Sequence, residues 1–255
     1  MDVTIVGCSG SFAGPESPAS SYLVRTEHEG RTWSIVLDLG NGALGALQRH
    51  VRPYDVDAVL LSHLHVDHCI DMCGLYVMMK YVPGGPGRGV MPTWGPKGTG
   101  EYLARAYGSV DSDGVQHVFR FEELSDGGTV RIGPFSVTSL RVRHPIEAYG
   151  FRIEADGRTL AYTGDTDLCD ALTPLMTGAD LVLADSAFVE GRDAVEGIHL
   201  TGRRAADAAV RAGGVRRLML THIPAWNDPE QCRAQAQEVW PGEVELAEPG
   251  ATYTV

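Results

Sequence analysis

The chain has 255 residues, of which 44% are apolar and 21% charged, and its formal net charge is −12. This composition is typical of a globular protein with a full hydrophobic core, and the length does not require a second domain. Proteins that grip long nucleic acids usually need a concentrated positive surface, so the acidic balance disfavours such a partner, although a local basic groove or metal ions could still attract phosphate. We therefore expect one domain, residues 1–255, and no long nucleic acid as partner. A small anionic substrate stays open.

The sequence also limits the compartment in which the protein works. No apolar stretch approaches the roughly 18 residues of a membrane span, and the segment MDVTIVGCSG enters a strand pattern without a basic leader. Five cysteines, an odd number with irregular spacing, argue against a disulfide framework. We expect a cytoplasmic protein with reduced thiols and no membrane partner.

Short runs rich in Val, Ile, Leu and Tyr predict strands along most of the chain. The predicted strands are Val3–Val6, Tyr22–Arg25, Trp33–Asp38, Ala58–Ser62, Phe135–Arg143, Gly150–Glu154, Thr159–Thr163, Leu181–Asp185 and Leu218–His222. The predicted helices are Gly42–Arg49, Asp67–Tyr81, Gly98–Tyr107, Asp170–Met176, Gly202–Ala212 and Pro229–Val239. Two sheets with helices on their outer faces satisfy this order, which gives an α/β fold of four layers, αββα.

The segment Tyr81–Gly100, YVPGGPGRGVMPTWGPKGTG, is too rich in glycine and proline for regular structure. We expect a loop around one short strand at most. Whether it forms a lid or rim over a site or a plain surface excursion stays open.

The stretch LSHLHVDHC, residues 61–69, follows the predicted strand Ala58–Ser62 and carries three histidines and an aspartate. His63 and His65 can face the same way in an extended turn, while Asp67 and His68 point from a first helical turn toward a neighbouring position. One such histidine alone would be interpreted as solvated or hydrogen-bonded. Burying all four side chains is costly without compensation, and neutral imidazole with carboxylate is a ligand set for first-row metals. The unit predicts ligands for two metals.

This His-x-His-x-Asp-His motif resembles the signature of the metallo-β-lactamase superfamily, an αββα sandwich. Three residues at predicted strand ends match further ligands of that family, namely His144 in RVRHP, Asp165 in AYTGDTD and His222 in LMLTHIP. The resemblance implies one metal on His63, His65 and His144 and a second on Asp67, His68 and His222, with Asp165 shared. The implied cofactors are two divalent ions, Zn²⁺ in the first place, although the same ligand set accepts Mn²⁺ or Fe²⁺.

Asp38 in IVLDLGNG resembles the family's Asp-x-Gly turn behind the ligands. There a hydrogen bond from the carboxylate would fix the tautomer of a ligand imidazole and raise its basicity. The alternative is an ordinary turn that begins with aspartate. Both interpretations stay open.

Two features distinguish branches of this family. Lactamases proper carry cysteine where this chain has Asp165, so β-lactam cleavage is not implied, while thioesterases and lactonases share the aspartate. The segment GIHLTGRRAADAAVRAGG, residues 197–214, resembles the ribonuclease Z branch, whose extra histidine is matched by His199. That histidine stands beside the second metal and handles the leaving oxygen. The alternative is a helix-capping turn at His199 and Thr201.

The chain between Asp165 and His222 has no room for the basic arm with which tRNA-processing members of that branch clamp tRNA. The overall pattern resembles the compact actinobacterial atypical class II cyclic-nucleotide phosphodiesterases. This implies hydrolysis of a small anionic phosphodiester, first 3′,5′-cyclic AMP to 5′-AMP, by a homodimer. Asp67 would orient the nucleophile, and His199 would protonate the leaving oxygen or bind the phosphoryl group.

Three alternatives to this function are kept. One is a ribonuclease Z-like RNA-processing nuclease, and another is a lactone or thioester hydrolase in which His199 is idle. The third is a metal-binding fold without catalysis. Trp226 and Phe188 follow candidate strand ends and could stack on a purine base, whereas core packing is the other role for either ring.

Overall fold

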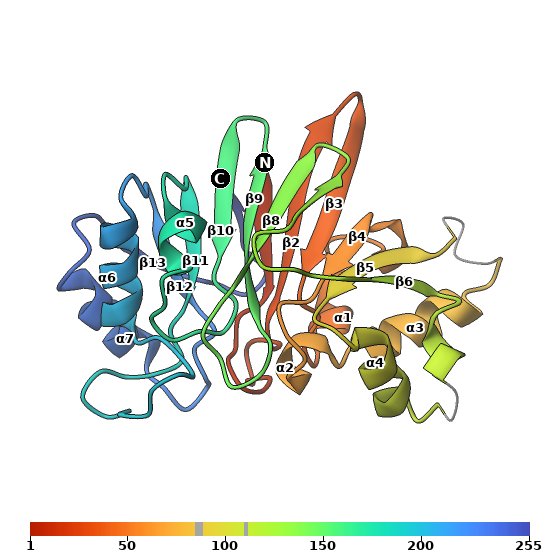
Figure 1. Ribbon diagram of the computed structural model, residues 1–255, viewed down its shortest axis with the longest axis horizontal. Coiled ribbons are helices and arrows are strands. Elements are labelled where there is room, and N and C mark those ends of the chain that lie inside the picture. The colour runs from red at the N-terminus through yellow and green to blue at the C-terminus, as the bar shows by residue number, and fades with distance from the viewer. Residues whose placement is uncertain (85–88, 110–111) are drawn as a thin grey trace.

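The computed structural model describes residues 1–84, 89–109 and 112–255. Two seven-stranded sheets pack face to face, and helices cover the outer face of each sheet (Figure 1). The four-layer α/β architecture expected from the sequence is therefore confirmed.

The two sheets follow the same pairing pattern. The first has the order β14-β1-β2-β3-β4-β5-β6 and the second the order β13-β12-β11-β10-β9-β8-β7. In the first sheet the strands from β14 to β3 pair antiparallel, and those from β3 to β6 pair parallel. In the second sheet the strands from β7 to β10 pair antiparallel, and those from β10 to β13 pair parallel. The bounds of the first sheet are β1 Asp2–Gly7, β2 Ser21–His28, β3 Arg31–Leu37, β4 Ala58–Leu60, β5 Met91–Gly95, β6 Phe119–Glu123 and β14 Thr252–Thr254. Those of the second are β7 Thr129–Ile132, β8 Phe135–Arg141, β9 Tyr149–Ala155, β10 Arg158–Tyr162, β11 Leu181–Asp185, β12 Leu218–Thr221 and β13 Val244–Leu246.

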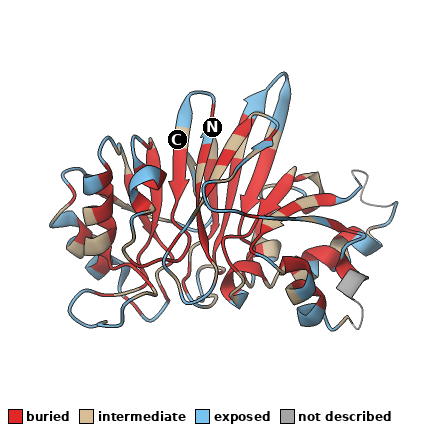
Figure 2. Ribbon diagram, in the orientation of Figure 1, coloured by how far each residue is buried: buried red, intermediate tan, exposed pale blue. Residues whose placement is uncertain are grey.

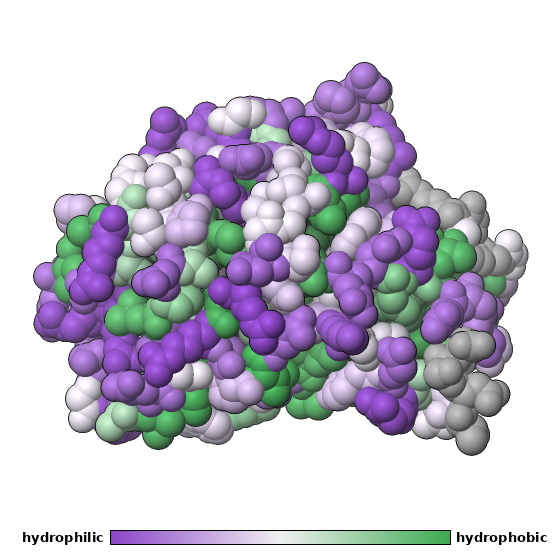
Figure 3. Space-filling view, in the orientation of Figure 1, coloured by the Kyte–Doolittle hydropathy of each residue, from purple (hydrophilic) through white to green (hydrophobic). Residues whose placement is uncertain are grey.

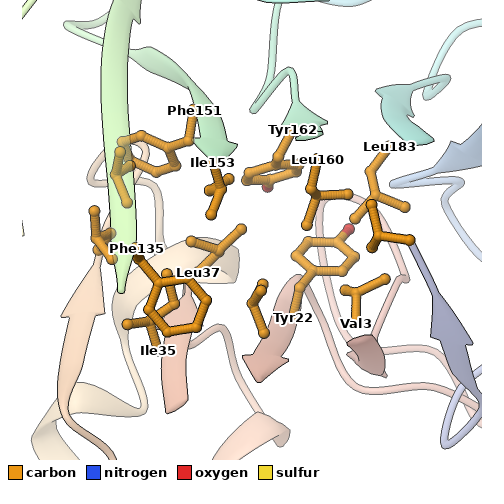
Figure 4. Close-up of a cluster of buried hydrophobic side chains, with 14 of the residues drawn as sticks. Val3, Tyr22, Ile35, Leu37, Phe135, Phe151, Ile153, Leu160, Tyr162 and Leu183 are labelled. Atoms are coloured by element: carbon orange, nitrogen blue, oxygen red, sulfur yellow. The ribbon is translucent and has the colours of Figure 1, made fainter. Parts of the chain in front are cut away.

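The main core lies between the two sheets, and two further clusters lie beneath the helices (Figure 2). Figure 4 shows Tyr22, Leu37 and their neighbours from the first sheet facing Phe151, Tyr162 and their neighbours from the second. Alternation along a strand explains the layers: Leu37 in β3 faces the other sheet, while the adjacent Val36 faces the helices. Continuous apolar runs in the central strands therefore reflect burial on both faces.

The helices flank the sheets in two groups (Figure 1). Those beside the first sheet are α1 Ala43–Leu47, α2 Val66–Cys69, α3 Met72–Tyr81 and α4 Thr99–Tyr107; those beside the second are α5 Leu172–Met176, α6 Gly202–Ala212 and α7 Pro229–Gln237. The prediction of one continuous helix over Asp67–Tyr81 was wrong. Between α2 and α3 the Asp71 carboxylate accepts a hydrogen bond from the Leu44 N–H, and the Asp71 N–H donates to the Leu39 carbonyl.

The sequence also underestimated the number of strands. β6, β7, β13 and β14 were not predicted, because they are short strands in the outer parts of the sheets and alternate apolar with polar or charged residues. The Gly- and Pro-rich segment 81–100 contains one short strand, β5, as expected, and it also contains the start of α4. Residues 85–88 lie outside the described residues, and the lid stays an open prediction.

Candidate site residues gather at the lower edge of the sandwich in Figure 1, opposite the β2–β3 and β9–β10 hairpins. The carboxyl ends of β3, β4, β8, β10, β11 and β12 all reach this edge, and each leads into a loop. All of these strands except β11 end one or two residues earlier than predicted. Because β4 ends at Leu60 and β8 at Arg141, His63 and His144 lie on loops beyond them. All five cysteines are free. Within the described ranges, no helix is long and apolar enough to cross a membrane.

Candidate metal centre

Short loops at the strand ends place the predicted ligands. His63 lies beyond β4, His65 is the residue before α2, and Asp67 and His68 belong to the single turn of that helix. His222 follows β12 directly with a φ angle of 58°. A non-glycine residue in this left-handed region costs on the order of 1–3 kcal/mol and persists where the surroundings impose it.

Three imidazoles converge on the first position. Nδ1 of His65 lies 3.0 Å from Nε2 of His63 and 3.1 Å from Nε2 of His144. Asp165 joins them, with Oδ2 3.6 Å from Nε2 of His63. The four residues form a cluster that could hold a metal ion.

A second cluster lies directly beside the first. Nε2 of His68 is 3.2 Å from Oδ1 of Asp165 and 3.4 Å from Oδ2 of Asp67. Nε2 of His222 is 3.2 Å from Oδ2 of Asp165. Asp165 therefore belongs to both clusters, and the structure brings all seven predicted ligands together.

Buried polar atoms without hydrogen-bond partners show whether these residues suit a metal ion. Within the described part of the chain, Nε2 of His68, Nε2 of His222 and Oδ1 of Asp165 are buried and accept or donate no hydrogen bond. Orphaned buried groups of this kind are costly unless a ligand satisfies them. All three point to the shared cluster, and nitrogen and carboxylate donors fit a divalent transition metal.

In four of these histidines, Nδ1, the ring nitrogen that faces away from the clusters, contacts an oxygen atom of the surrounding protein. The four Nδ1 contacts are Ser62 Oγ at 3.0 Å for His63, Asp38 Oδ2 at 2.8 Å for His68, Ile198 O at 2.9 Å for His144 and Ser20 Oγ at 2.9 Å for His222. Such contacts fix the ring orientation and the tautomer that presents Nε2 to a metal.

Asp38 is fully buried and gathers four donors. Oδ1 accepts from the Ser62 N–H at 2.6 Å, while Oδ2 accepts from Ser62 Oγ at 2.8 Å, Tyr162 Oη at 2.7 Å and His68 Nδ1 at 2.8 Å. Its φ angle is 58°. Of the two roles left open, the hydrogen bond to His68 corresponds to support of a ligand.

Burial lowers the pKa of His63 well below its ordinary value, and it also lowers the pKa values of His65 and His222. A lowered pKa favours the neutral imidazole, which is the form that binds a metal. His68 differs. Burial opposes its protonation, but the charges of Asp165 and Asp38 raise its pKa well above the ordinary value.

The carboxylates of the clusters stay ionised. Burial would raise the pKa of Asp67, but the neighbouring imidazole of His68 lowers it to about 2. Burial would likewise raise the pKa of Asp165, but the neighbouring imidazoles of His222 and His68 hold it well below the ordinary value. The buried carboxylates of Asp67 and Asp165 thus lie beside the buried atoms that have no hydrogen-bond partner. This concentration of negative charge favours a bound cation.

His199 stands at the edge of the second cluster. Its Nδ1 lies 2.9 Å from Oδ2 of Asp185 and 3.9 Å from Oδ2 of Asp165, and its ring is 5.4 Å from that of His222. Burial would lower the pKa of His199, but the charge and hydrogen bond of Asp185 raise it to about 9. Since Asp185 holds Nδ1, Nε2 is left to act on a ligand.

The comparisons with known proteins agree with this geometry. A family model described as a beta-lactamase superfamily domain matches residues 34–223. The chain belongs to the metallo-β-lactamase superfamily. An uncharacterised protein of Mycobacterium leprae is 42% identical over 99% of this chain and 88% of its own length. Ribonuclease Z of Mycobacterium bovis is 29% identical over 96% of this chain and 95% of its own.

One relative also has a solved structure. The probable metallo-hydrolase YhfI of Bacillus subtilis is 29% identical over 99% of both chains. Its crystal structure superposes with a TM-score of 0.86 and covers 99% of both chains at 28% identity. The chain is thus a metallo-hydrolase of the metallo-β-lactamase superfamily, with His/Asp clusters able to bind metal.

Asp185 was not singled out from the sequence. It ends β11, and Oδ2 accepts from the Thr166 N–H at 3.0 Å while Oδ1 accepts from the Ala187 N–H at 3.0 Å. These bonds fix the carboxylate that holds His199. The available signal was an acid at the end of an apolar strand, the same placement that marks Asp165.

Asp167 was also missed, although it ties together three loops of this metallo-hydrolase site. Its buried carboxylate accepts from Arg204 Nη1 at 2.7 Å and from the Gly197 N–H at 2.6 Å. Arg143 Nη1 lies 3.7 Å away. The signal in the sequence was the second acid of the motif TGDTD.

The two aromatic residues expected near a substrate lie in different places. The Phe188 ring is 5.1 Å from the His199 ring in an edge-on arrangement, so it reaches the site. Trp226 packs 4.7 Å from the ring of Phe12 and is 66% exposed. Core packing was therefore a wrong expectation for Trp226, because its ring lies on the surface.

We expect Asp38→Asn to weaken metal binding on the order of 10- to 100-fold. The amide nitrogen cannot accept hydrogen bonds, so one of the two carboxylate positions that hold His68 and Ser62 is lost. Metal affinity measured by competition with a chromogenic chelator checks this. The control is Asp126→Asn, which alters an exposed carboxylate that accepts from the Arg141 N–H. Equal affinities in both variants would contradict the role of Asp38.

We expect Asp167→Asn to lower the free energy of unfolding by about 1–3 kcal/mol, because Arg204 and Gly197 lose a charged acceptor. The loop that follows Gly197 carries Ile198, which holds His144, and His199, so turnover should fall as well. Denaturant unfolding and steady-state kinetics measure the two effects. Glu196→Gln removes an exposed charge near Arg143 and should change stability by less than about 0.5 kcal/mol. Indistinguishable variants would refute the assignment.

Proposed function

We propose that the protein is a metal-dependent phosphodiesterase that hydrolyses a small phosphodiester, first 3′,5′-cyclic AMP to 5′-AMP. The observation that carries this proposal is the His199–Asp185 pair beside Asp165 and His222. A protonated imidazole there lies within the reach of a phosphoryl group at the second cluster. Both the pentacoordinate phosphorus and the departing alkoxide develop negative charge that this group can stabilise.

The seven ligands divide into two sets in the proposal. His63, His65 and His144 would hold one divalent ion, Asp67, His68 and His222 the other, with Asp165 shared, and Zn²⁺ is the first candidate. Divalent ions supply a nucleophile at neutral pH by lowering the pKa of water from about 15.7 to about 7, and they stabilise charge on phosphoryl oxygens.

The remaining steps belong to residues of the chain. The ionised Asp67 carboxylate lines the cleft beside the clusters and would orient the attacking oxygen through a hydrogen bond. Nε2 of His199 would donate a proton to the leaving 3′ oxygen as the P–O bond breaks. Asp185 would hold the imidazole in the orientation for that transfer. In a thioester or lactone hydrolase, this His–Asp pair would have no comparable task.

Two features favour a small substrate over a structured RNA. Between Asp165 and His222 the chain is taken up by α5, β11, the His199 loop and α6, which leaves no extended basic arm. The net charge is −12, which opposes a polyanion. The 29% identity to a ribonuclease Z supports phosphodiester chemistry and keeps an RNA-processing nuclease as the second candidate. Homodimerisation and a cytoplasmic location are further proposals that rest on resemblance.

We expect His199→Ala to lower kcat for 3′,5′-cyclic AMP roughly 10²- to 10⁴-fold, the usual contribution of a general acid. Hydrolysis of bis(p-nitrophenyl) phosphate should fall less, because p-nitrophenolate leaves without a proton. Metal content should stay unchanged. The control is His28→Ala, a side chain 46% exposed at the far hairpin.

Three results would contradict this role. Loss of metal in His199→Ala would make His199 a ligand, since it also belongs to a cluster with Asp165, Asp185 and His222. Equal losses on both phosphodiesters would exclude proton donation. Turnover of a homoserine lactone or a thioester by the unmodified, metal-loaded protein, with both phosphodiesters untouched, would overturn the proposed function, while cleavage of a tRNA precursor alone would favour the nuclease.

A further inference from the structure

A cleft of about 590 Å³ adjoins the metal clusters on the side of the first sheet. Two predicted ligands, His65 and Asp67, form part of its wall. The rest of the wall comes from the loop before α2, the start of α2, the loop between β5 and α4, the first half of α4 and the loop after β8. The residues are Leu64, Val66, Pro96, Lys97, Tyr102, Ile146 and Glu147. The cleft is thus continuous with the candidate site.

The residues that line the cleft are mostly apolar, and two of them are exposed to solvent. Val66 is 53% exposed and Ile146 is 38% exposed. Figure 3 shows hydrophobic surface on the lower edge of the molecule beside α2, the helix that begins at Val66. Large apolar side chains left open at a charged metal site indicate that a ligand covers them.

One cation stands at the rim. Lys97 is exposed and forms no hydrogen bond or ion pair with the residues that the structure describes. In a chain of net charge −12, an unpaired ammonium beside an apolar cleft complements an anionic ligand that also carries an apolar part.

We propose that this cleft is the subsite for the nucleoside of the phosphodiester, with the base packed against Ile146, Val66 and Tyr102. Lys97 attracts the anion to the cleft mouth. This inference rests on the proposed phosphodiesterase function and names the part of the substrate that determines specificity. The volume of about 590 Å³ agrees with this occupant, since a phosphoryl group alone fills a small fraction of it and ligand pockets measure roughly 300–1,000 Å³.

Other hollows fit this role less well. A cavity of about 280 Å³ lies behind His222, between the Cys8–Ser17 loop and the Leu220–Pro229 segment, and no predicted ligand lines it. Phe188 packs against His199 and supports the reacting groups rather than a distant base. Trp226 packs against Phe12 on the surface, and it is not among the residues that line the cleft.

The test compares two substrates that release the same leaving group. The p-nitrophenyl ester of 5′-AMP carries adenosine, whereas methyl p-nitrophenyl phosphate carries only a methyl group. Ile146→Ser, which adds no charge, should lower kcat/KM for the adenosine substrate roughly 10- to 100-fold, mainly through KM, because it removes apolar packing against the base. The methyl substrate should change less than about threefold. The matched control is Val210→Ser on α6, an apolar residue 46% exposed and outside the cleft.

A second variant tests the cation. Lys97→Met should lower kcat/KM for both anionic substrates at low ionic strength and make it less dependent on salt, since the ammonium attracts charge and not a base. Metal content should match that of the unmodified protein in both variants. Unchanged salt dependence would remove Lys97 from the proposal.

A binding measurement separates this inference from the proposed function. Calorimetry with 5′-AMP and with methyl phosphate should show that Ile146→Ser weakens the binding of 5′-AMP alone, whether or not a phosphodiester is hydrolysed. Equal effects on both ligands, or equal kinetic losses on both substrates, would overturn the nucleoside subsite. Absence of hydrolysis with selective loss of 5′-AMP binding would instead keep the subsite and overturn the phosphodiesterase.

Discussion

The site depends on the burial of negative charge. Asp38 and Asp165 are almost fully enclosed on either side of His68, and Asp67 lies beside them. A buried carboxylate is stable only when it is paired, and here the imidazole of His68 takes up positive charge between two of them. Atoms of His68, His222 and Asp165 are still left without partners. A divalent cation shared by these groups would satisfy all of them.

The sandwich serves this arrangement by bringing the ends of its strands to one edge. Each sheet supplies part of the ligand set, so the clusters form only when the two sheets pack. Close approaches of the backbone complete the enclosure. A Cβ atom on Gly40 would lie 1.9 Å from the Asp67 carbonyl oxygen, and one on Gly10 would lie 2.3 Å from that of His222. The left-handed backbone at Asp38 and His222 is held by the same packing. The positive φ angles and the tight loops therefore orient the ligand side chains toward the clusters.

Much of this arrangement could be predicted from the sequence, because the ligands follow strand ends and four of them share one short motif. The central strands were predicted well for the same reason: burial on both faces makes them continuous apolar runs. Asp185 and Asp167 were missed although both are acids that follow apolar strands, since their function lies in contacts with His199, Gly197 and Arg204, which only the fold brings near. The break before α3 was missed because it depends on Leu39 and Leu44, far along the chain from Asp71. Hydrogen bonds between loops far apart in the chain produce no periodic pattern of apolar and polar residues in the sequence.

In the proposed function, the residues that act on the reacting atoms and the cleft that determines substrate specificity lie on different sides of the clusters. His199 and Asp185 act on the leaving oxygen at the second sheet, and the cleft beside His65 receives the organic part of the substrate at the first. The proposed function requires two metal positions. The most direct test is anomalous diffraction from crystals of the zinc-loaded protein, collected at the zinc edge. Two peaks are expected, one among His63, His65 and His144 and one among Asp67, His68 and His222, with Asp165 touching both. A single peak, or metal bound by His199 in place of the Asp67 cluster, would contradict the dinuclear site.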